Sequence, residues 1–261
     1  MKVLVTFAVD AEFAPWRAMR KFRFIDYQGL RLWRSDEGKV EITALVTGMG
    51  AESAALAMDL MMSMADGDQY FDVCVSSGLA GALTESLSPE QIIAPQGLVV
   101  EQKHRDLPSD RIEVDTELRK VAIEFGAKDM DCLFTTDKVL VKADEKKICS
   151  SKAEAVDMES FDIVKEAVAW GARCVVIRAI SDSSKEELPI DFNLTLSGEK
   201  QVSVAKVILQ LAKNPLVLPA LLRFAKQSRR AADALARFLE QYVAGPAGIA
   251  SLNWAQRVAA K

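Results

Sequence analysis

The chain has 261 residues, half of them hydrophobic, so it can bury a sizeable core as one large α/β domain. Its net charge of -4 argues against a general nucleic-acid-binding protein, because a protein that follows phosphates needs a basic surface. The apolar run at the amino terminus is interrupted by Asp10 and is too short for a signal peptide or a membrane span. We therefore expect a cytoplasmic protein.

Few side chains are available for metal or nucleophilic chemistry. The four cysteines form no C-x-x-C pair, and two of them lie in apolar, strand-like runs, which favours buried free thiols. His104 is the only histidine and lies in the polar loop E-Q-K-H-R-D, so a Ser-His-Asp triad or a histidine-rich metal site has almost nothing to draw on. We expect neither a metal nor another cofactor.

The first third of the chain alternates between strand and helix patterns. The predicted elements are a strand over 2–9, a hairpin of 22–27 and 30–34 around Gln28-Gly29, a strand over 40–46, a helix over 51–64 and a strand over 71–76. Glu12 follows the first strand, where an α/β fold opens its cleft, although it could instead cap the next helix. The turn at 47–50, T-G-M-G, lets the backbone approach a ligand near Met49.

The second part of the chain places two more carboxylates at the ends of core elements. The predicted elements are a strand over 91–100, a helix over 116–125, a strand over 132–136, a solvated charged stretch over 142–152, a helix ended by Gly171 and a strand over 174–180. Glu159 precedes the predicted helix that Gly171 ends, and Asp182 follows the predicted strand over 174–180. In an α/β fold these ends lie at the edge of the sheet that carries the chemistry.

Two motifs carry a resemblance to a known family. V-D-M-E-S at 156–160 is followed, after one helix, by V-V-I-R-A-I-S-D at 175–182. This pair resembles the nucleoside phosphorylase and nucleosidase superfamily, and most closely its methylthioadenosine/S-adenosylhomocysteine nucleosidase branch. The likeness spans most of residues 1–212. It implies an α/β domain with three layers, α/β/α, around a central mixed, partly barrel-like sheet, with residues 213–261 as a separate helical tail.

The resemblance also implies roles for the acidic residues in cleaving a purine nucleoside. Asp182 would give a proton to N7 of the leaving base, and Glu159 would accept hydrogen bonds from the ribose 2′- and 3′-hydroxyls. Met158 would pack against the sugar. Glu12, with Arg178 nearby, would position and activate the attacking water. The alternative for Arg178 is a structural ion pair with Glu159 or Asp157.

Four further positions follow from the same resemblance. Val139 and Leu140 would cover the purine and bind its edge through the backbone, unless they only continue an apolar strand. Gly78 belongs to a turn that lines the ribose and the nucleophile. Leu79 stands where the family commonly has a hydroxyl residue, which makes the pocket more apolar.

The predicted activity is hydrolysis of a 5′-substituted adenosine, with release of adenine. Phosphate-binding members of the superfamily commonly carry glycine and arginine after the first strand, whereas this chain has A-V-D-A-E-F, whose acids repel phosphate. A phosphate-dependent purine nucleoside phosphorylase and a non-catalytic nucleoside-binding protein are the alternatives. A dinucleotide-dependent oxidoreductase is disfavoured, because no G-x-G-x-x-G turn follows the first strand.

The last part of the chain predicts a basic amphipathic helix. Residues 213–261 hold eight lysines and arginines against two acidic residues, and apolar side chains recur at helical spacing from Leu218 to Tyr242. This helix could pack on its own domain, on a second subunit or on an anionic membrane surface. A basic helix of this kind and an apolar residue at Leu79 resemble features of the hopanoid-associated branch of the superfamily. That resemblance implies an adenosylated lipid as substrate. The family also implies a homodimer.

Overall fold

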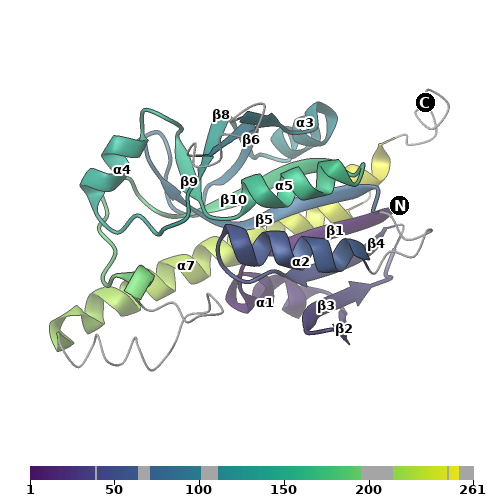
Figure 1. The fold of residues 1–261 in the computed structure, drawn as a ribbon, viewed down its shortest axis with the longest axis horizontal. Coiled ribbons are helices and arrows are strands. Elements are labelled where there is room, and N and C mark those ends of the chain that lie inside the picture. The colour runs from purple at the N-terminus through teal and green to yellow at the C-terminus, as the bar shows by residue number, and fades with distance from the viewer. Residues whose placement is uncertain (39, 64–70, 101–110, 195–213, 246, 253–261) are drawn as a thin grey trace.

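The structure, a computed structural model, describes residues 1–38, 40–63, 71–100, 111–194, 214–245 and 247–252. They form a central ten-stranded mixed sheet with helices on both faces (Figure 1). This is the predicted three-layer α/β/α architecture, with a helix at the carboxyl end. The sequence pattern also predicts a closing helix over 203–211, and this segment, His104 and the predicted boundary at residue 212 lie outside the described residues.

One half of the sheet closes into a barrel. The strands are β1 (Lys2–Phe7), β2 (Arg23–Tyr27), β3 (Leu30–Ser35), β4 (Glu41–Val46), β5 (Val73–Ala82), β6 (Ile92–Val100), β7 (Arg111–Glu113), β8 (Lys128–Thr135), β9 (Ala155–Asp157) and β10 (Arg173–Asp182). Strand β10 pairs with both β5 and β6, while β8 and β9 connect β6 back to β5, so five strands form a ring. Strands β1, β4, β3 and β2 extend the sheet from β5, which confirms the prediction of a partly barrel-like sheet.

The helices cover the sheet in two groups. They are α1 (Asp10–Met19), α2 (Ala51–Ser63), α3 (Thr116–Glu124), α4 (Ala143–Cys149), α5 (Ser160–Ala169) and α7 (Leu218–Leu239). Buried side chains of α1, α3 and α7 share one hydrophobic cluster, and those of α2 and α5 share the other. The first strand shows why the sheet has two such faces. Alternate side chains point to opposite sides, so Val3 and Val5 enter the first cluster and Leu4 enters the second.

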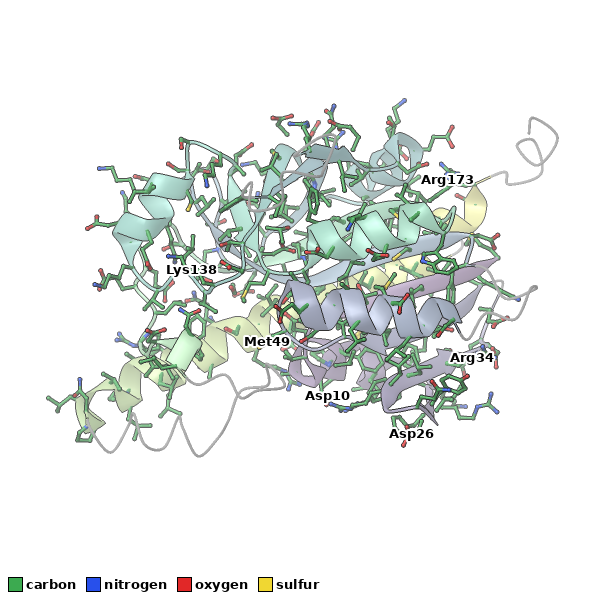
Figure 2. The ribbon with its side chains drawn as sticks, viewed as in Figure 1. Asp10, Asp26, Arg34, Met49, Lys138 and Arg173 are labelled. Atoms are coloured by element: carbon green, nitrogen blue, oxygen red, sulfur yellow. The ribbon has the colours of Figure 1, made fainter. Side chains whose placement is uncertain are left out.

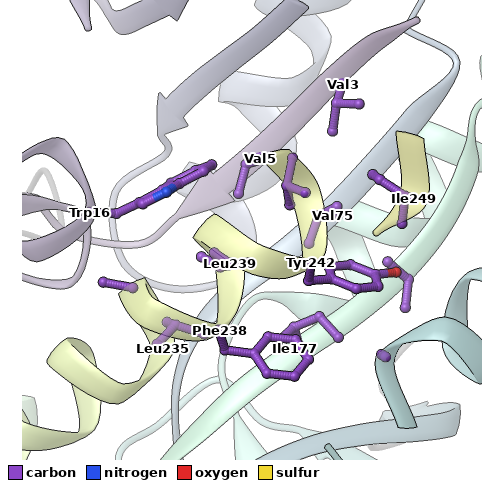
Figure 3. Close-up of a cluster of buried hydrophobic side chains, with 14 of the residues drawn as sticks. Val3, Val5, Trp16, Val75, Ile177, Leu235, Phe238, Leu239, Tyr242 and Ile249 are labelled. Carbon is purple, nitrogen blue, oxygen red and sulfur yellow. The ribbon is translucent and has the colours of Figure 1, made fainter. Parts of the chain in front are cut away.

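The second half of α7 belongs to the core of the domain. Leu235, Leu239 and Tyr242 are buried against β1, β5 and β10 (Figure 3). Beyond the helix, Glu240 accepts a hydrogen bond from Trp16 Nε1 over 2.8 Å and pairs with Arg20 over 2.8 Å. The first half of α7 is different, because none of its side chains before Ala231 is fully buried.

Two predictions of local structure were wrong. Strand β5 does not end at Ser76 but continues to Ala82, because its small residues pair with β10 on one side and with β9 on the other. The stretch 142–152 is not simply solvated. It forms α4, and one of its lysines, Lys146, is buried with 1% of its side chain exposed. Both errors affect the walls of the cavity described next.

Candidate active site

A cavity of about 280 Å³ opens where β1, β5, β8, β9 and β10 end. The predicted site residues that line it are Glu12, Met49, Val139, Leu140, Met158, Glu159 and Asp182. They come from five separate segments of the chain, and Met49 borders the cavity below the loop that carries Lys138 (Figure 2). The three acids therefore face one space, as the ends of strands in an open α/β sheet predict. The other two predicted residues, Arg178 and Gly78, lie directly behind this wall and are not part of it.

Glu12 both caps α1 and faces the cavity. Its Oε2 accepts hydrogen bonds from the backbone amides of Ala8 (3.0 Å) and Val9 (3.4 Å), and its Oε1 accepts from the amide of Leu79 (3.0 Å). Burial raises the pKa of Glu12, and the charge of Arg178 opposes this rise. A buried carboxylate of this kind can orient a water molecule and take its proton.

Arg178 forms a structural ion pair, one of the two roles that the sequence allowed for it, and its partner is Asp157. The Nη2 atom of Arg178 lies 2.7 Å from Asp157 Oδ2, with both side chains buried, and Nη1 donates to the carbonyl of Ser77 over 2.8 Å. Gly78 has a φ of +145°, and a β-carbon there would overlap with Arg178 Nη1. Arg178 therefore lies behind the cavity wall, where its positive charge stabilises the ionised form of Glu12. Gly78 leaves the space that the Arg178 side chain occupies.

Glu159 occupies the cap position of α5 and accepts a hydrogen bond from the amide of Gly50 over 2.7 Å. Burial, with the nearby negative charge of Asp157 as the second cause, raises the pKa of Glu159 to about 8. Met158 and Met49 line the cavity together with this carboxyl group. The arrangement offers a hydrogen-bonding group between two apolar side chains, which suits the hydroxyl edge and the carbon face of a sugar.

Asp182 ends β10 and has both of its oxygens engaged. Ser181 Oγ donates to Oδ1 over 2.5 Å, and Lys146 Nζ donates to Oδ2 over 2.5 Å. Burial raises the pKa of Asp182, while Lys146 opposes the rise. Lys146 is a residue of the site that sequence reasoning missed, because the run of charges around it is typical of an exposed helix face.

Apolar side chains also line the cavity, and one of them comes from the carboxyl-terminal helix. Val139 and Leu140 lie in a loop after β8, so they do not continue that strand. The side-chain amide of Asn193 pairs with both the N–H (2.8 Å) and the carbonyl (3.0 Å) of Val139. Phe192 and Phe224, with ring centroids 5.5 Å apart, complete this wall. The sequence placed Phe224 in a tail and gave no signal for its role.

A wider groove of about 770 Å³ adjoins the cavity. The two spaces share Ala8, Val9 and Met49, and the groove continues along α2 past Leu56, which is 61% exposed. A ligand in the cavity could therefore extend a substituent into the groove.

Among the described residues, no three acidic, histidine or cysteine side chains are grouped so that they could hold a metal ion. No helix of those residues combines the length and apolar character needed to span a bilayer.

The fold of the chain resembles those of several solved structures. The chain resembles the 5′-methylthioadenosine/S-adenosylhomocysteine nucleosidase of Helicobacter pylori at 20% identity and a TM-score of 0.71, over 94% of this chain and 98% of that one. It also resembles the futalosine hydrolase of Helicobacter pylori (20% identity, TM-score 0.69, 94% and 97% covered) and the Campylobacter jejuni nucleosidase (18%, 0.67, 92% and 99%). At these identities the likeness shows a shared fold. The family model of the phosphorylase superfamily matches residues 2–213, and the chain belongs to that superfamily.

Proposed function

We propose that the chain is a nucleosidase that hydrolyses the N-glycosidic bond of a 5′-substituted adenosine and releases adenine. The observation that carries the proposal is the meeting of three buried carboxyl groups, from Glu12, Glu159 and Asp182, around one cavity of about 280 Å³. Nucleosidases of the same fold, among them the Helicobacter pylori protein, support the reaction class.

Each carboxyl group answers one requirement of the reaction. The leaving base must receive a proton, and Asp182, buried on the cavity wall, is the group placed to deliver it. The sugar becomes positively charged as the bond breaks, and an ionised Glu159 stabilises that charge through the ribose hydroxyls. Water must lose a proton as it attacks, and Glu12 accepts it. In this proposal Val139 and Leu140 cover the base. If the base binds the backbone N–H and carbonyl of Val139, the side chain of Asn193 must first release them.

Two features favour water over phosphate as the nucleophile. Lys138 and Lys146 are the cationic residues among the described cavity-lining side chains, and Lys146 is already bound to Asp182. No arginine is among those lining side chains, and Glu12 would repel a dianion at the place where the nucleophile enters. A phosphorylase remains the alternative to be tested.

The adjoining groove supports a 5′-substituent and a second subunit. A substituent that leaves the cavity beside Met49 would enter the groove, which has about 770 Å³ of space. The exposed Leu56 on α2 borders the same groove and supports the proposal that a second copy of the chain covers it as a homodimer.

The proposed function is tested by incubating the purified protein with adenosine derivatives that range from short 5′-thioethers to lipid-tailed adenosines. Free adenine should appear without phosphate, and adding phosphate should not increase the rate or yield a ribose 1-phosphate. Asp182→Asn should lower kcat by about 10²-fold or more, since the general acid is lost. Phosphate-dependent release would favour a phosphorylase, and binding without release would favour a non-catalytic nucleoside-binding protein.

We also propose contact between the first part of α7 and an anionic membrane. Leu216, just before α7, and Leu218 and Leu222 in its first turns are exposed to 87%, 45% and 61%, and basic residues lie on α7. Phe224, two residues further on, lines the cavity, so a lipid-tailed substrate could pass from the membrane to the site. Sedimentation with anionic vesicles should capture the protein, and changing the three leucines to serine should abolish capture. Equal capture of the variant would contradict this proposal.

A further inference from the structure

Lys146 and Asp182 form a buried ion pair whose two members both line the cavity. Their side chains are 1% and 8% exposed, and Lys146 Nζ lies 2.5 Å from Asp182 Oδ2. The two residues come from α4 and from the end of β10, 36 positions apart. Both line the cavity, so the pair borders the space in which the leaving base would lie.

The amine of Lys146 has three oxygen partners. Besides Asp182, Nζ donates to the carbonyls of Ser183 (2.9 Å) and Glu186 (2.7 Å). An ammonium has three N–H donors and a neutral amine has two, so three oxygen partners fit the charged form. Removing an ammonium from water is costly unless its donors are satisfied, and here they are. The three contacts therefore suit an ammonium group beside the carboxyl group of Asp182.

The contacts of Asp182 indicate that its carboxyl group is ionised. Oδ1 accepts from Ser181 and Oδ2 from Lys146, so both oxygens act as acceptors, as those of a carboxylate do. Glu186 is the other charged group near Asp182, and its Oε2 accepts a hydrogen bond from Gln227 on α7 over 2.9 Å. A carboxylate has no proton of its own to give, so the leaving base needs another source.

We propose that Lys146 supplies the proton that Asp182 passes to the leaving base. This inference rests on the proposed nucleosidase function. As the bond between C1′ and the base breaks, its electron pair goes to the base. A ring nitrogen then takes a proton from Asp182, which receives one from Lys146 Nζ. The water oxygen bonds to C1′, and the water proton goes to Glu12. Glu12 afterwards loses its proton and Lys146 regains one, so each turnover splits one water molecule.

Burial supports such a transfer, because it favours uncharged groups. When the proton moves from Lys146 to Asp182, a charged pair becomes a neutral pair at almost no cost in solvation. Lys146 acts through Asp182 and is thus a positioning residue and proton source rather than a group that binds the base. An arginine would keep a positive charge beside Asp182 but would not release a proton. This difference separates the proposal from a merely structural ion pair.

The test compares Lys146→Met, Lys146→Arg and, as a control, Lys147→Met, which changes the exposed neighbour on α4. Lys146→Arg should fold and bind substrate with a KM near that of the wild type, while its kcat falls about 10²-fold. Lys146→Met should lose kcat to a similar extent, and Lys147→Met should match the wild type. A nucleoside methylated at N7, whose base needs no proton to leave, should lose less than tenfold in both Lys146 variants.

A wild-type kcat in Lys146→Arg, or an equal loss with the methylated nucleoside, would overturn the proton transfer. A measurement independent of turnover is the infrared carboxyl band of Asp182, identified by subtracting the spectrum of Asp182→Asn. Near pH 7 it should be that of a carboxylate in the wild type and in Lys146→Arg, and of a protonated acid in Lys146→Met. A wild-type protein that releases no base would instead refute the proposed function, and the infrared comparison would still decide whether Lys146 sets the state of Asp182.

Discussion

The amide of Gly50 donates a hydrogen bond to Glu159 Oε1 over 2.7 Å, so the turn after β4 holds the carboxyl group that begins α5, 109 residues later. Gly50 has a φ of +82°, a conformation that glycine adopts at little cost. The contact fixes one oxygen of Glu159 and leaves the other for a ligand in the cavity.

The pKa of Glu159 predicts a dependence of activity on pH. This pKa is raised to about 8, so most free protein at pH 7 carries the protonated acid. If the ionised form must accept hydrogen bonds from the ribose, kcat/KM should rise roughly tenfold per pH unit below 8 and level off above it. The Glu159→Gln variant should be slow and should lack this rise. A flat profile in the wild type between pH 6 and 8 would contradict the role given to Glu159.

The same pKa predicts an effect on stability. The folded state binds the proton of Glu159 more tightly than the unfolded state does, so its contribution is complete below about pH 4.5 and is lost as the pH rises to about 8. Glu159→Gln has no such proton to lose. Its unfolding free energy relative to the wild type should therefore increase by roughly 1–3 kcal/mol from pH 5 to pH 8. Urea unfolding at both values measures the change, and a constant difference would contradict the prediction.

Gly78 predicts a severe effect of a small substitution. In Gly78→Ala the new methyl group meets Arg178 Nη1, and the backbone keeps a φ of +145° that alanine rarely adopts. We expect a loss of roughly 2–4 kcal/mol in unfolding free energy, together with low activity, because Arg178 must move. Gly29→Ala is the matched control: its φ is also positive, but no atom lies within 4 Å of the added carbon. It should lose only about 1 kcal/mol. Equal losses in both variants would contradict this account.

The ion pair of Arg178 and Asp157 predicts strong coupling between two mutations. Arg178→Met leaves Asp157 buried without its cation, which should cost about 3–5 kcal/mol of unfolding free energy. Adding Asp157→Asn removes the unpaired charge, so the double variant should recover part of that loss. Recovery of stability without recovery of activity would show that the charge of Arg178 also serves Glu12. Additive losses would mean that the two residues do not act as a pair.

The fold could be predicted largely because its signals are local or carried by motifs. The β-branched run of β1 and the Gln28-Gly29 turn, where both residues have a positive φ, specify a strand and a hairpin without tertiary context. The end of β5 could not be found in this way. Ser76 to Ala82 has little hydrophobic pattern, and it is extended only because β9 and β10 lie beside it.

The residues that line the cavity also divide into those that the sequence could locate and those that it could not. Glu12, Glu159 and Asp182 could be found because each follows or precedes a core element at the functional edge of the sheet. Lys146 and Phe224 could not, because nothing near either of them in sequence differs from an exposed helix. Their roles arise from packing between distant segments, as when α4 turns one lysine of a charged run inward to reach Asp182.

Helix α7 runs from the cavity wall to the hydrophobic core beside β1. Phe224 and Ser228 face the cavity, Gln227 donates to the carbonyl of Ser181 over 2.7 Å, and the last turns are buried beside β1. A molecule in the cavity would therefore brace the less buried turns of this helix against local opening. Slower hydrogen–deuterium exchange of its early amides on saturation would report occupancy, even for compounds that are never turned over.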